Sequence, residues 1–289
     1  KSKSIYKAIL VGCILIPFNS YWIMTIELGR YLAYPTCISL FFNVIFTLFV
    51  LQTLNLILVR LLPQLAFSAH DLLIIYTMLS IASGISGLDM MQDVVSNLGH
   101  AFWYATPEND WEQLFWRYLP KHLIVDDLKA LRGYYEESSN LLIPLHFRAW
   151  FVPCLMWTGF ISLLVLMMTC LNVVLRKQWI EREKLSYPII QLPLEMIRHR
   201  DLSGLFGNRV LIIGFLLAVG IDLLNGLGVF YPVIPQIPIR GYDLRQLLTE
   251  KPWSAVSWFP IRFYPFVIGL GFLIPLDLSF SCWSFDLIY

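Results

Sequence analysis

The sequence predicts an all-α protein: a polytopic bundle of about six transmembrane helices with a folded helical segment outside the membrane. Three observations support this class. Hydrophobic residues make up 57% of the 289 residues. Only 14% are charged, whereas a soluble domain carries about 25% charged residues. Long apolar segments also recur along the chain, and about 20 apolar residues in a helix suffice to cross the hydrocarbon core of a bilayer.

Six apolar segments are the predicted spans, because a membrane-crossing backbone must satisfy its own hydrogen bonds as a helix. They are residues 8–26, 36–59, 72–88, 151–175, 210–231 and 263–285. The second and fourth contain no charged residue. The third is short, the fifth contains Asp222, and the sixth contains Pro265, Pro275 and Asp277, which leaves these three open to breaks or re-entrant turns.

The first segment carries polar groups near its outer end. Pro17 removes a backbone hydrogen bond, and Asn19 and Tyr21 add polar groups at the same level, so the helix is expected to be discontinuous there. Broken helices commonly form transport paths. Glu27 and Arg30 lie three residues apart on one helical face, and a structural ion pair is the favoured interpretation.

Small residues recur at helical spacing from Ser80 to Gly87 in the third segment, which predicts close helix packing. Asp89 and Gln92 follow directly. Two interpretations of this pair stay open: the outer mouth of a polar cavity, or a hydrated helix end.

The connection over residues 89–149 is too long and too aromatic for a simple loop and is expected to fold. Its composition is acidic, with nine carboxylates against five Lys and Arg residues. A helix is predicted from Thr106 to Pro120, because Thr106, Pro107 and Glu108 form a typical helix start. A second is predicted from Asp126 to Arg132, ending at Gly133. The segment is interpreted as an aromatic belt at the outer interface, or as a lid over a vestibule.

Basic residues near the span ends predict an orientation with the amino terminus in the cytoplasm. Lys1, Lys3 and Lys7 lie at the amino terminus, and seven Lys and Arg residues lie within the connection 176–209. The chain thus divides into three spans over residues 1–88, an extracytoplasmic helical segment over 89–149, and three further spans over 150–289 with a basic cytoplasmic loop.

Asp222 and Asn225 lie one turn apart in the fifth segment, ahead of two glycines and three prolines, so this helix is expected to break near the outer leaflet. Asp277 follows Pro275 in the last segment and repeats the pattern. Carboxylates within spans are functional candidates, and a buried one could carry a proton. A position in headgroup water is the alternative for Asp222.

No catalytic or metal-binding pattern is present. The histidines are scattered, and no HExxH, GxSxG, P-loop or GxGxxG motif occurs. A formal net charge of +1 offers no attraction to nucleic acid. We therefore expect no enzyme activity, no cofactor, no metal site and no nucleic-acid partner.

Three short stretches carry a resemblance to a known superfamily. The sequence Lys-Leu-Ser-Tyr-Pro at 184–188 resembles the KL-(S/T)-(Y/F)-P segment of the oligopeptide transporter superfamily, which includes the yellow-stripe metal-chelate carriers. Phe-Asn-Ser-Tyr-Trp at 18–22 is similar to the asparagine-tyrosine region in their first helix. Residues 105–111 and 183–196 resemble a bacterial offshoot, mostly described as uncharacterised multi-pass membrane proteins.

The chain also departs from the transporters. Ile-Ile-Gln-Leu-Pro at 189–193 stands where they commonly continue with small residues such as SGTA, and their Asn-Pro-Gly motif does not occur. These departures weaken the substrate class that the resemblance implies more than they weaken the fold that it implies. The resemblance implies that the chain is roughly the amino-terminal half of a longer, all-helical transporter built on repeats.

The leading hypothesis is a secondary transporter, or half of one, in the cytoplasmic (inner) membrane of a bacterium. Its cargo would be a small organic solute such as a peptide or metal chelate, and its expected partners are the lipid bilayer and an unknown small-molecule or ion substrate. A homo-oligomer is left open. The alternative is a non-transporting scaffold that binds a partner through its aromatic outer segment. The predicted path residues are Asn19, Tyr21, Glu27, Arg30, Asp89, Gln92, Asp222, Asn225 and Asp277.

Overall fold

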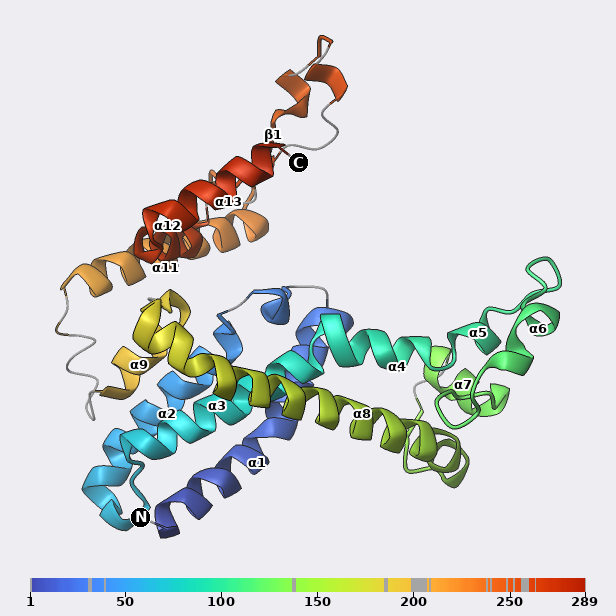
Figure 1. The fold of residues 1–289 in the computed structure, drawn as a ribbon. Coiled ribbons are helices and arrows are strands. Elements are labelled where there is room, and N and C mark those ends of the chain that lie inside the picture. The colour runs from blue at the N-terminus through green and yellow to red at the C-terminus, as the bar shows by residue number, and fades with distance from the viewer. Residues whose placement is uncertain are drawn as a thin grey trace. The chain divides into compact units, whose positions relative to one another are not determined.

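The computed structural model of the chain is mainly helical in the part that it describes (Figure 1). The described residues are 2–30, 33–38, 40–136, 139–184, 187–198, 207, 209–237, 239, 241–247, 249–251, 253–255, 260–262 and 264–288. Several predictions fall outside them: Leu185 and Ser186 of the Lys-Leu-Ser-Tyr-Pro stretch, residues 199–206 and 208 of the basic connection, and Phe263. Within the described residues, strand β1 (Tyr242–Asp243) pairs antiparallel with β2 (Pro260–Ile261).

Five helices among the described residues are long and apolar enough to cross a membrane. They cover Ile5–Gly29, Phe42–Leu61, Ala69–Asn97, Pro144–Arg182 and Arg209–Phe230. Each contains or overlaps one of the first five predicted spans, so the all-helical class is confirmed. The agreement arises because the apolar length required for a crossing is visible directly in the sequence.

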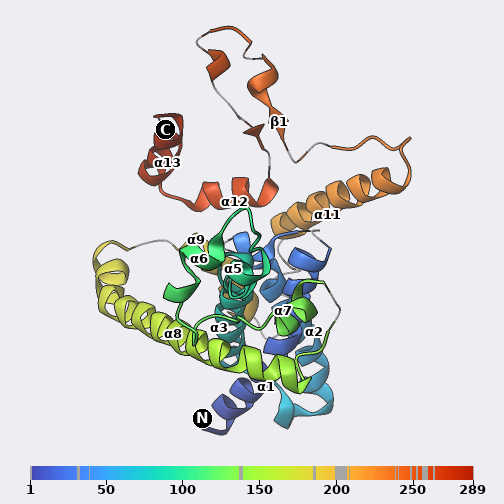
Figure 2. The ribbon, with the colours of Figure 1, turned by 90° about the vertical axis from the view of Figure 1, so that its right-hand side faces the viewer.

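The sixth predicted span consists of two helices, α12 (Pro265–Leu273) and α13 (Leu276–Ile288), drawn at an angle to each other in Figure 2. Ile274 adopts an extended conformation between them, with φ −82° and ψ 138°. The residue before a proline is disfavoured in the helical region, so Pro275 explains the interruption. The break predicted from this proline is confirmed.

Helix α1 (Ser2–Met24) runs without interruption through Pro17 and continues into a π-helical segment, η1 (Thr25–Gly29). The predicted break at Asn19 and Tyr21 is therefore wrong. Proline is tolerated inside apolar helices where neighbouring helices and local adjustments satisfy the freed backbone group. The irregular turn lies closer to the carboxyl end of the helix, at Glu27.

Helix α11 (Arg209–Phe230) is likewise continuous through Asp222 and Asn225, so the predicted break within the fifth span is also wrong. The helix ends at Phe230, two residues before Pro232. Glycine lowers helix stability by about 1 kcal/mol relative to alanine. Gly226 and Gly228 therefore weaken this helix without ending it.

The remaining elements of the amino-terminal half connect these helices. The 3-10 segment η2 (Pro35–Cys37) precedes α2 (Phe42–Leu61), and η3 (Pro63–Leu65) leads to α3 (Ala69–Ser86). A second π-helical segment, η4 (Leu88–Gln92), joins α3 to α4 (Asp93–Asn97). Each of the two π-helical segments thus lies next to a helix that could cross a membrane.

The chain forms two compact units. Unit 1 comprises Lys1–Ile9, Ile45–Tyr76 and Ser186–Tyr289, and unit 2 comprises Leu10–Val44 and Thr77–Leu185. Unit 1 contains α9 (Pro188–Arg198), α11, α12, α13 and the 3-10 segments η7 (Leu244–Leu247) and η8 (Trp253–Ala255). Unit 2 contains α4 through α8.

In unit 1, buried polar side chains hold the α2–α3 connection. Lys7 Nζ donates to the carbonyl oxygens of Leu65, at 3.2 Å, and Ala66, at 2.6 Å. The same nitrogen lies 3.9 Å from the buried carboxylate of Asp71. Asn55 bonds the backbone of Phe67 twice, through its amide nitrogen at 3.0 Å and its amide oxygen at 2.7 Å. These bonds fix the connection to α1 and α2.

In unit 2, residues 89–149 fold as short helices, as the sequence predicts. They are α4, α5 (His100–Trp103), α6 (Trp111–Leu114), the 3-10 segment η5 (Trp116–Tyr118) and α7 (Leu128–Tyr135). Helix α8 (Pro144–Lys177) follows and ends in the π-helical segment η6 (Gln178–Arg182).

The predicted helix starts in this segment are only partly right. Thr106 and Asn109 exchange side-chain hydrogen bonds with each other's backbone N–H groups, and Asp110 is left-handed with φ 56°, so helix α6 begins only at Trp111. Helix α7 begins close to the predicted position, with Asp127 as its amino-terminal cap. The prediction that Gly133 ends it is wrong, because α7 continues to Tyr135. A Cβ at Gly133 would lie against the His146 ring, so this glycine serves close packing.

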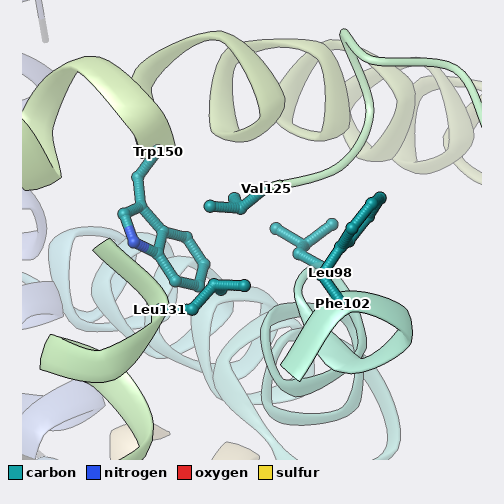
Figure 3. Close-up of a cluster of buried hydrophobic side chains, with 5 residues drawn as sticks. All are labelled: Leu98, Phe102, Val125, Leu131 and Trp150. Atoms are coloured by element: carbon teal, nitrogen blue, oxygen red, sulfur yellow. The ribbon is translucent and has the colours of Figure 1, made fainter. Parts of the chain in front are cut away.

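The segment over residues 89–149, which we call the outer segment after its predicted position, has its own hydrophobic core, formed by Leu98, Phe102, Val125 and Leu131 with Trp150 of α8 (Figure 3). Two indole N–H groups anchor it, donating from Trp116 to the Ala101 carbonyl at 2.9 Å and from Trp157 to the Leu123 carbonyl at 3.0 Å. Because the core joins α4, α5, α7 and α8, the segment is a folded subdomain as well as an aromatic surface.

Replacing Leu131 with alanine is expected to destabilise the outer segment by about 2–5 kcal/mol, because it leaves a cavity in a fully buried site. Urea unfolding followed by tryptophan fluorescence measures the change. Leu128→Ala is the matched control on the same helix, since Leu128 is exposed. Equal losses in the two variants would contradict this assignment of the core.

The outer segment is also expected to lose stability in alkali. Burial raises the pKa of Tyr135 to about 12, with smaller contributions from Tyr134 and Tyr104, and its hydroxyl donates to the Ser96 carbonyl at 2.6 Å. Because the folded pKa exceeds the usual 10.0, this stability is complete below pH 10 and lost as the pH rises through 12. Ultraviolet titration with parallel circular dichroism tests this, and Tyr135→Phe should remove the dependence where Tyr118→Phe does not.

Candidate functional site

Buried and half-buried polar side chains form two hydrogen-bonded groups and a pair of hydroxyls between the apolar helices of unit 2, and together we call them the polar seam. Its members come from α1, η1, η2, α2, α3 and η4, and they are Asn19, Ser20, Glu27, Thr36, Asn43, Ser83, Ser86 and Gln92. Polar groups in apolar helices are costly unless they are paired, and they are therefore candidates for function.

The middle of the polar seam is a triad of two amides and a hydroxyl. Asn19 donates from Nδ2 to Ser83 Oγ at 2.9 Å. Asn43 donates from Nδ2 both to Asn19 Oδ1, at 2.8 Å, and to Ser83 Oγ, at 3.0 Å. All three residues are buried. The triad thereby joins α1, α2 and α3 through hydrogen bonds.

The end of the polar seam is built around Glu27, whose exposed fraction is 0%. Its Oε1 accepts hydrogen bonds from the backbone N–H of Thr36, at 3.0 Å, and from the Thr36 hydroxyl, at 2.6 Å. Its Oε2 accepts from Gln92 Nε2 at 2.7 Å. We call this set of bonds among Glu27, Thr36 and Gln92 the π joint, because it joins the two π-helical segments η1 and η4.

The π-helical segments determine which side chains meet in the π joint. Glu27 lies in η1 and Gln92 in η4, 65 residues further along the chain. A π-helical turn is rare and frequently marks a functional position. Gly87 immediately precedes η4, and a Cβ there would lie 2.8 Å from the Thr36 methyl carbon. A glycine is therefore required for Thr36 to approach η4 this closely.

The predicted ion pair between Glu27 and Arg30 is wrong. In the described part of the chain, no Lys or Arg nitrogen lies within 4.0 Å of the Glu27 carboxylate. Arg30 is exposed and follows η1 with φ −123° and ψ −12°, outside the helical pattern on which the prediction depended. The carboxylate is instead satisfied by neutral donors.

Of the nine predicted path residues, Glu27 and Gln92 are hydrogen-bonded to each other, and Asn19 lies in the triad of the same polar seam. Tyr21 is 74% exposed on α1, and Asp89 and Asp277 are exposed as well. Asn43 and Thr36 were missed. A lone asparagine in an uncharged apolar segment is a usable signal for Asn43, whereas nothing in the sequence indicates Thr36.

Asp222 and Asn225 lie in unit 1, where they line a cavity of about 790 Å³ together with Gln236 and Tyr264. Asn225 has a structural role there. Its amide donates to the Ile237 carbonyl at 3.0 Å and accepts from the Ile237 N–H at 2.7 Å, which holds the chain after α11 against that helix. Asp222 is the carboxylate that lines this cavity.

No group of three or more His, Cys, Asp or Glu side chains that could hold a metal ion occurs among the residues described. The polar seam itself offers hydrogen-bonding groups and the buried carboxylate of Glu27.

In the part of the chain that the structure describes, these features define a mainly helical protein with five helices long and apolar enough to cross a membrane and with a polar seam among the first three of them. The chain belongs to the family described as Family of unknown function (DUF6785), whose model matches residues 1–289. No curated protein and no solved structure matches the chain.

Replacing Asn19 with alanine is expected to lower the free energy of unfolding by about 1–2 kcal/mol, because Asn43 and Ser83 each lose a buried hydrogen-bond partner. Thermal unfolding in detergent measures the effect. Tyr21→Phe provides the comparison on the same helix, since that side chain is exposed. An Asn19→Ala variant as stable as Tyr21→Phe would show that the triad does not stabilise the fold.

Proposed function

We propose that this chain is a secondary transporter, or half of one, for a small organic solute such as a peptide or metal chelate. The observation that carries the proposal is the polar seam. Ionisable side chains within membrane helices are costly, so such residues commonly mark substrate or ion pathways. Glu27 combines complete burial with a position in a helix long enough to cross a membrane.

The proposed setting is the cytoplasmic (inner) membrane of a bacterium, with the amino terminus inside. Basic residues in the connection after α8 support this orientation. In the proposed topology the pair α12 and α13 forms a sixth, interrupted crossing. Interrupted helices are common at the binding sites of secondary transporters, because their free backbone ends can contact a solute.

The cavity in unit 1 is the proposed solute site. Its volume of about 790 Å³ lies within the range of about 300–1,000 Å³ that is usual for small-molecule pockets. Its wall is mainly apolar, with Asp222, Gln236 and Tyr264 as polar contacts. A carboxylate in an apolar wall would select a solute that carries a positive charge or a hydrogen-bond donor.

Binding of a solute is expected to raise the midpoint of thermal unfolding of the purified full-length protein in a saturable manner. Peptides, metal chelates and organic acids are the classes to compare. For the class that binds, Asp222→Asn should raise the Kd about tenfold, through loss of a charge-assisted bond. Glu250→Gln is the control, because Glu250 is exposed and does not line the cavity.

Uptake into proteoliposomes then tests transport itself. A protein that shows neither a thermal shift nor uptake with any class would refute the transporter proposal. It would favour a scaffold that binds a partner through the outer segment, where Tyr104, Tyr118 and Tyr134 are exposed beside a folded core. Crosslinking in native membranes would then be expected to recover a partner on this segment.

A further inference from the structure

Glu27 carries the carboxylate of the polar seam, and no cationic side chain among the described residues pairs with it. Three neutral donors reach its two oxygens, and in the described residues no Lys or Arg nitrogen lies within 4.0 Å. A carboxylate without a cation in an apolar, fully buried place is stable only if it is well hydrogen-bonded or if it takes up a positive charge.

The groups that reach Glu27 are donors, which stabilise its ionised form and do not ligate a metal ion. Metal cations such as Ca²⁺ and Mg²⁺ require about six or more oxygen ligands, whereas the Thr36 N–H, the Thr36 hydroxyl and the Gln92 amide N–H are donors directed at the carboxylate. A hydrogen-bond acceptor for the hydroxyl of a protonated Glu27 also lies in the π joint. Gln92 is only 5% exposed, and its buried Oε1 has no hydrogen-bond partner among the residues that the structure describes.

We propose that Glu27 binds a proton and that its neutral form opens the π joint. The proton comes from water, forms an O–H bond on the carboxylate, and returns to water when the carboxylate ionises again. This proposal deepens the proposed function and rests on it only for what the proton would drive.

Opening follows from the strength of the bonds. Hydrogen bonds to an ionised carboxylate are about twice as strong as bonds between neutral groups. Protonation therefore weakens the bonds from Thr36 and Gln92 together. The new hydroxyl also needs an acceptor, and a rotation of the Gln92 amide that offers Oε1 would break the bond from Nε2 to the Ser86 carbonyl, at 3.1 Å. Either change loosens η4 from η1.

The other ionisable groups near the π joint lie on its exposed side. They are Arg30 after η1, Tyr34 and Cys37 around η2, and Asp89 and Asp93 in η4 and α4. Burial first, then the charge of Asp89 and that of Glu27, raises the pKa of the Cys37 thiol. Glu27 is thus the fully buried ionisable member of this set, and its charge extends to η2.

The test is hydrogen exchange of the full-length protein in detergent, followed by mass spectrometry for residues 33–38 and 87–92. Two amides report on the π joint: the Thr36 N–H donates to Glu27, and the Leu88 N–H donates to Thr36 Oγ1 at 3.3 Å. After correction for intrinsic rates, their protection should fall on the order of tenfold as the pH is lowered and Glu27 takes up the proton.

Two variants test the role of Glu27. Glu27→Gln carries an amide in place of the carboxylate and should show low protection at every pH. Gln92→Glu places a second carboxylate in the π joint, and because two adjacent carboxylates hold a shared proton more tightly, the loss of protection should move to higher pH. Asp93→Asn is the control, since Asp93 is exposed, and it should behave as the unaltered protein does.

The proposal is overturned if protection in the unaltered protein does not change with pH, or if Glu27→Gln keeps the same pH dependence. Should Glu27→Gln not fold, an unshifted profile in Gln92→Glu overturns it equally. The outcome is separate from transport. If protection of the π joint depends on pH but no solute is taken up, the transporter proposal is refuted and the proton site at Glu27 stands. If a solute is taken up but protection does not depend on pH, the proton site is refuted and the transporter proposal stands.

Discussion

A polar group between apolar helices has no water to bond with, so it must find its partners inside the protein. This constraint orders unit 2. Asn19, Asn43 and Ser83 satisfy one another within the triad, and Glu27 is satisfied by Thr36 and Gln92. Three of these bonds join residues 24 to 65 apart in the sequence, and the bond between Glu27 and Thr36 joins residues nine apart. The same polar side chains that would be costly alone thereby determine which helices of unit 2 pack together and in which register.

The helices themselves were largely predictable, because the number of apolar residues needed to cross a bilayer is a property that a sequence displays directly. The interruptions were not. Proline at position 17 suggested a break, yet α1 continues, and the irregular turn lies at Glu27 in a stretch with no proline. Pro275, by contrast, does separate two helices. Whether a proline ends a helix depends on what surrounds it, and a sequence does not record those surroundings.

The candidate site was predicted as a set of residue types but not as an arrangement. Glu27 and Gln92 were chosen for their charge and polarity within or next to apolar segments, and these two do meet. Their contact depends on two π-helical turns, which have no distinctive composition. In the outer segment, the helix predicted from Asp126 lies close to α7, which begins at Leu128. The capping rules that predicted a helix start at Thr106 did not locate α6, because Asp110 takes a left-handed conformation. Local rules succeed where tertiary contacts agree with them.

The π-helical segment η1 has a consequence for comparing members of this family. A π-helical turn closes its hydrogen bonds over five residues instead of four and so holds one residue more than an α-helical turn. A relative that lost one residue between Met24 and Arg30 would keep the helix but turn Glu27 or its successors to another face. Alignments of the family should therefore permit a single-residue gap within residues 25–29, and equivalence of the carboxylate should be judged on structural superposition rather than on column position.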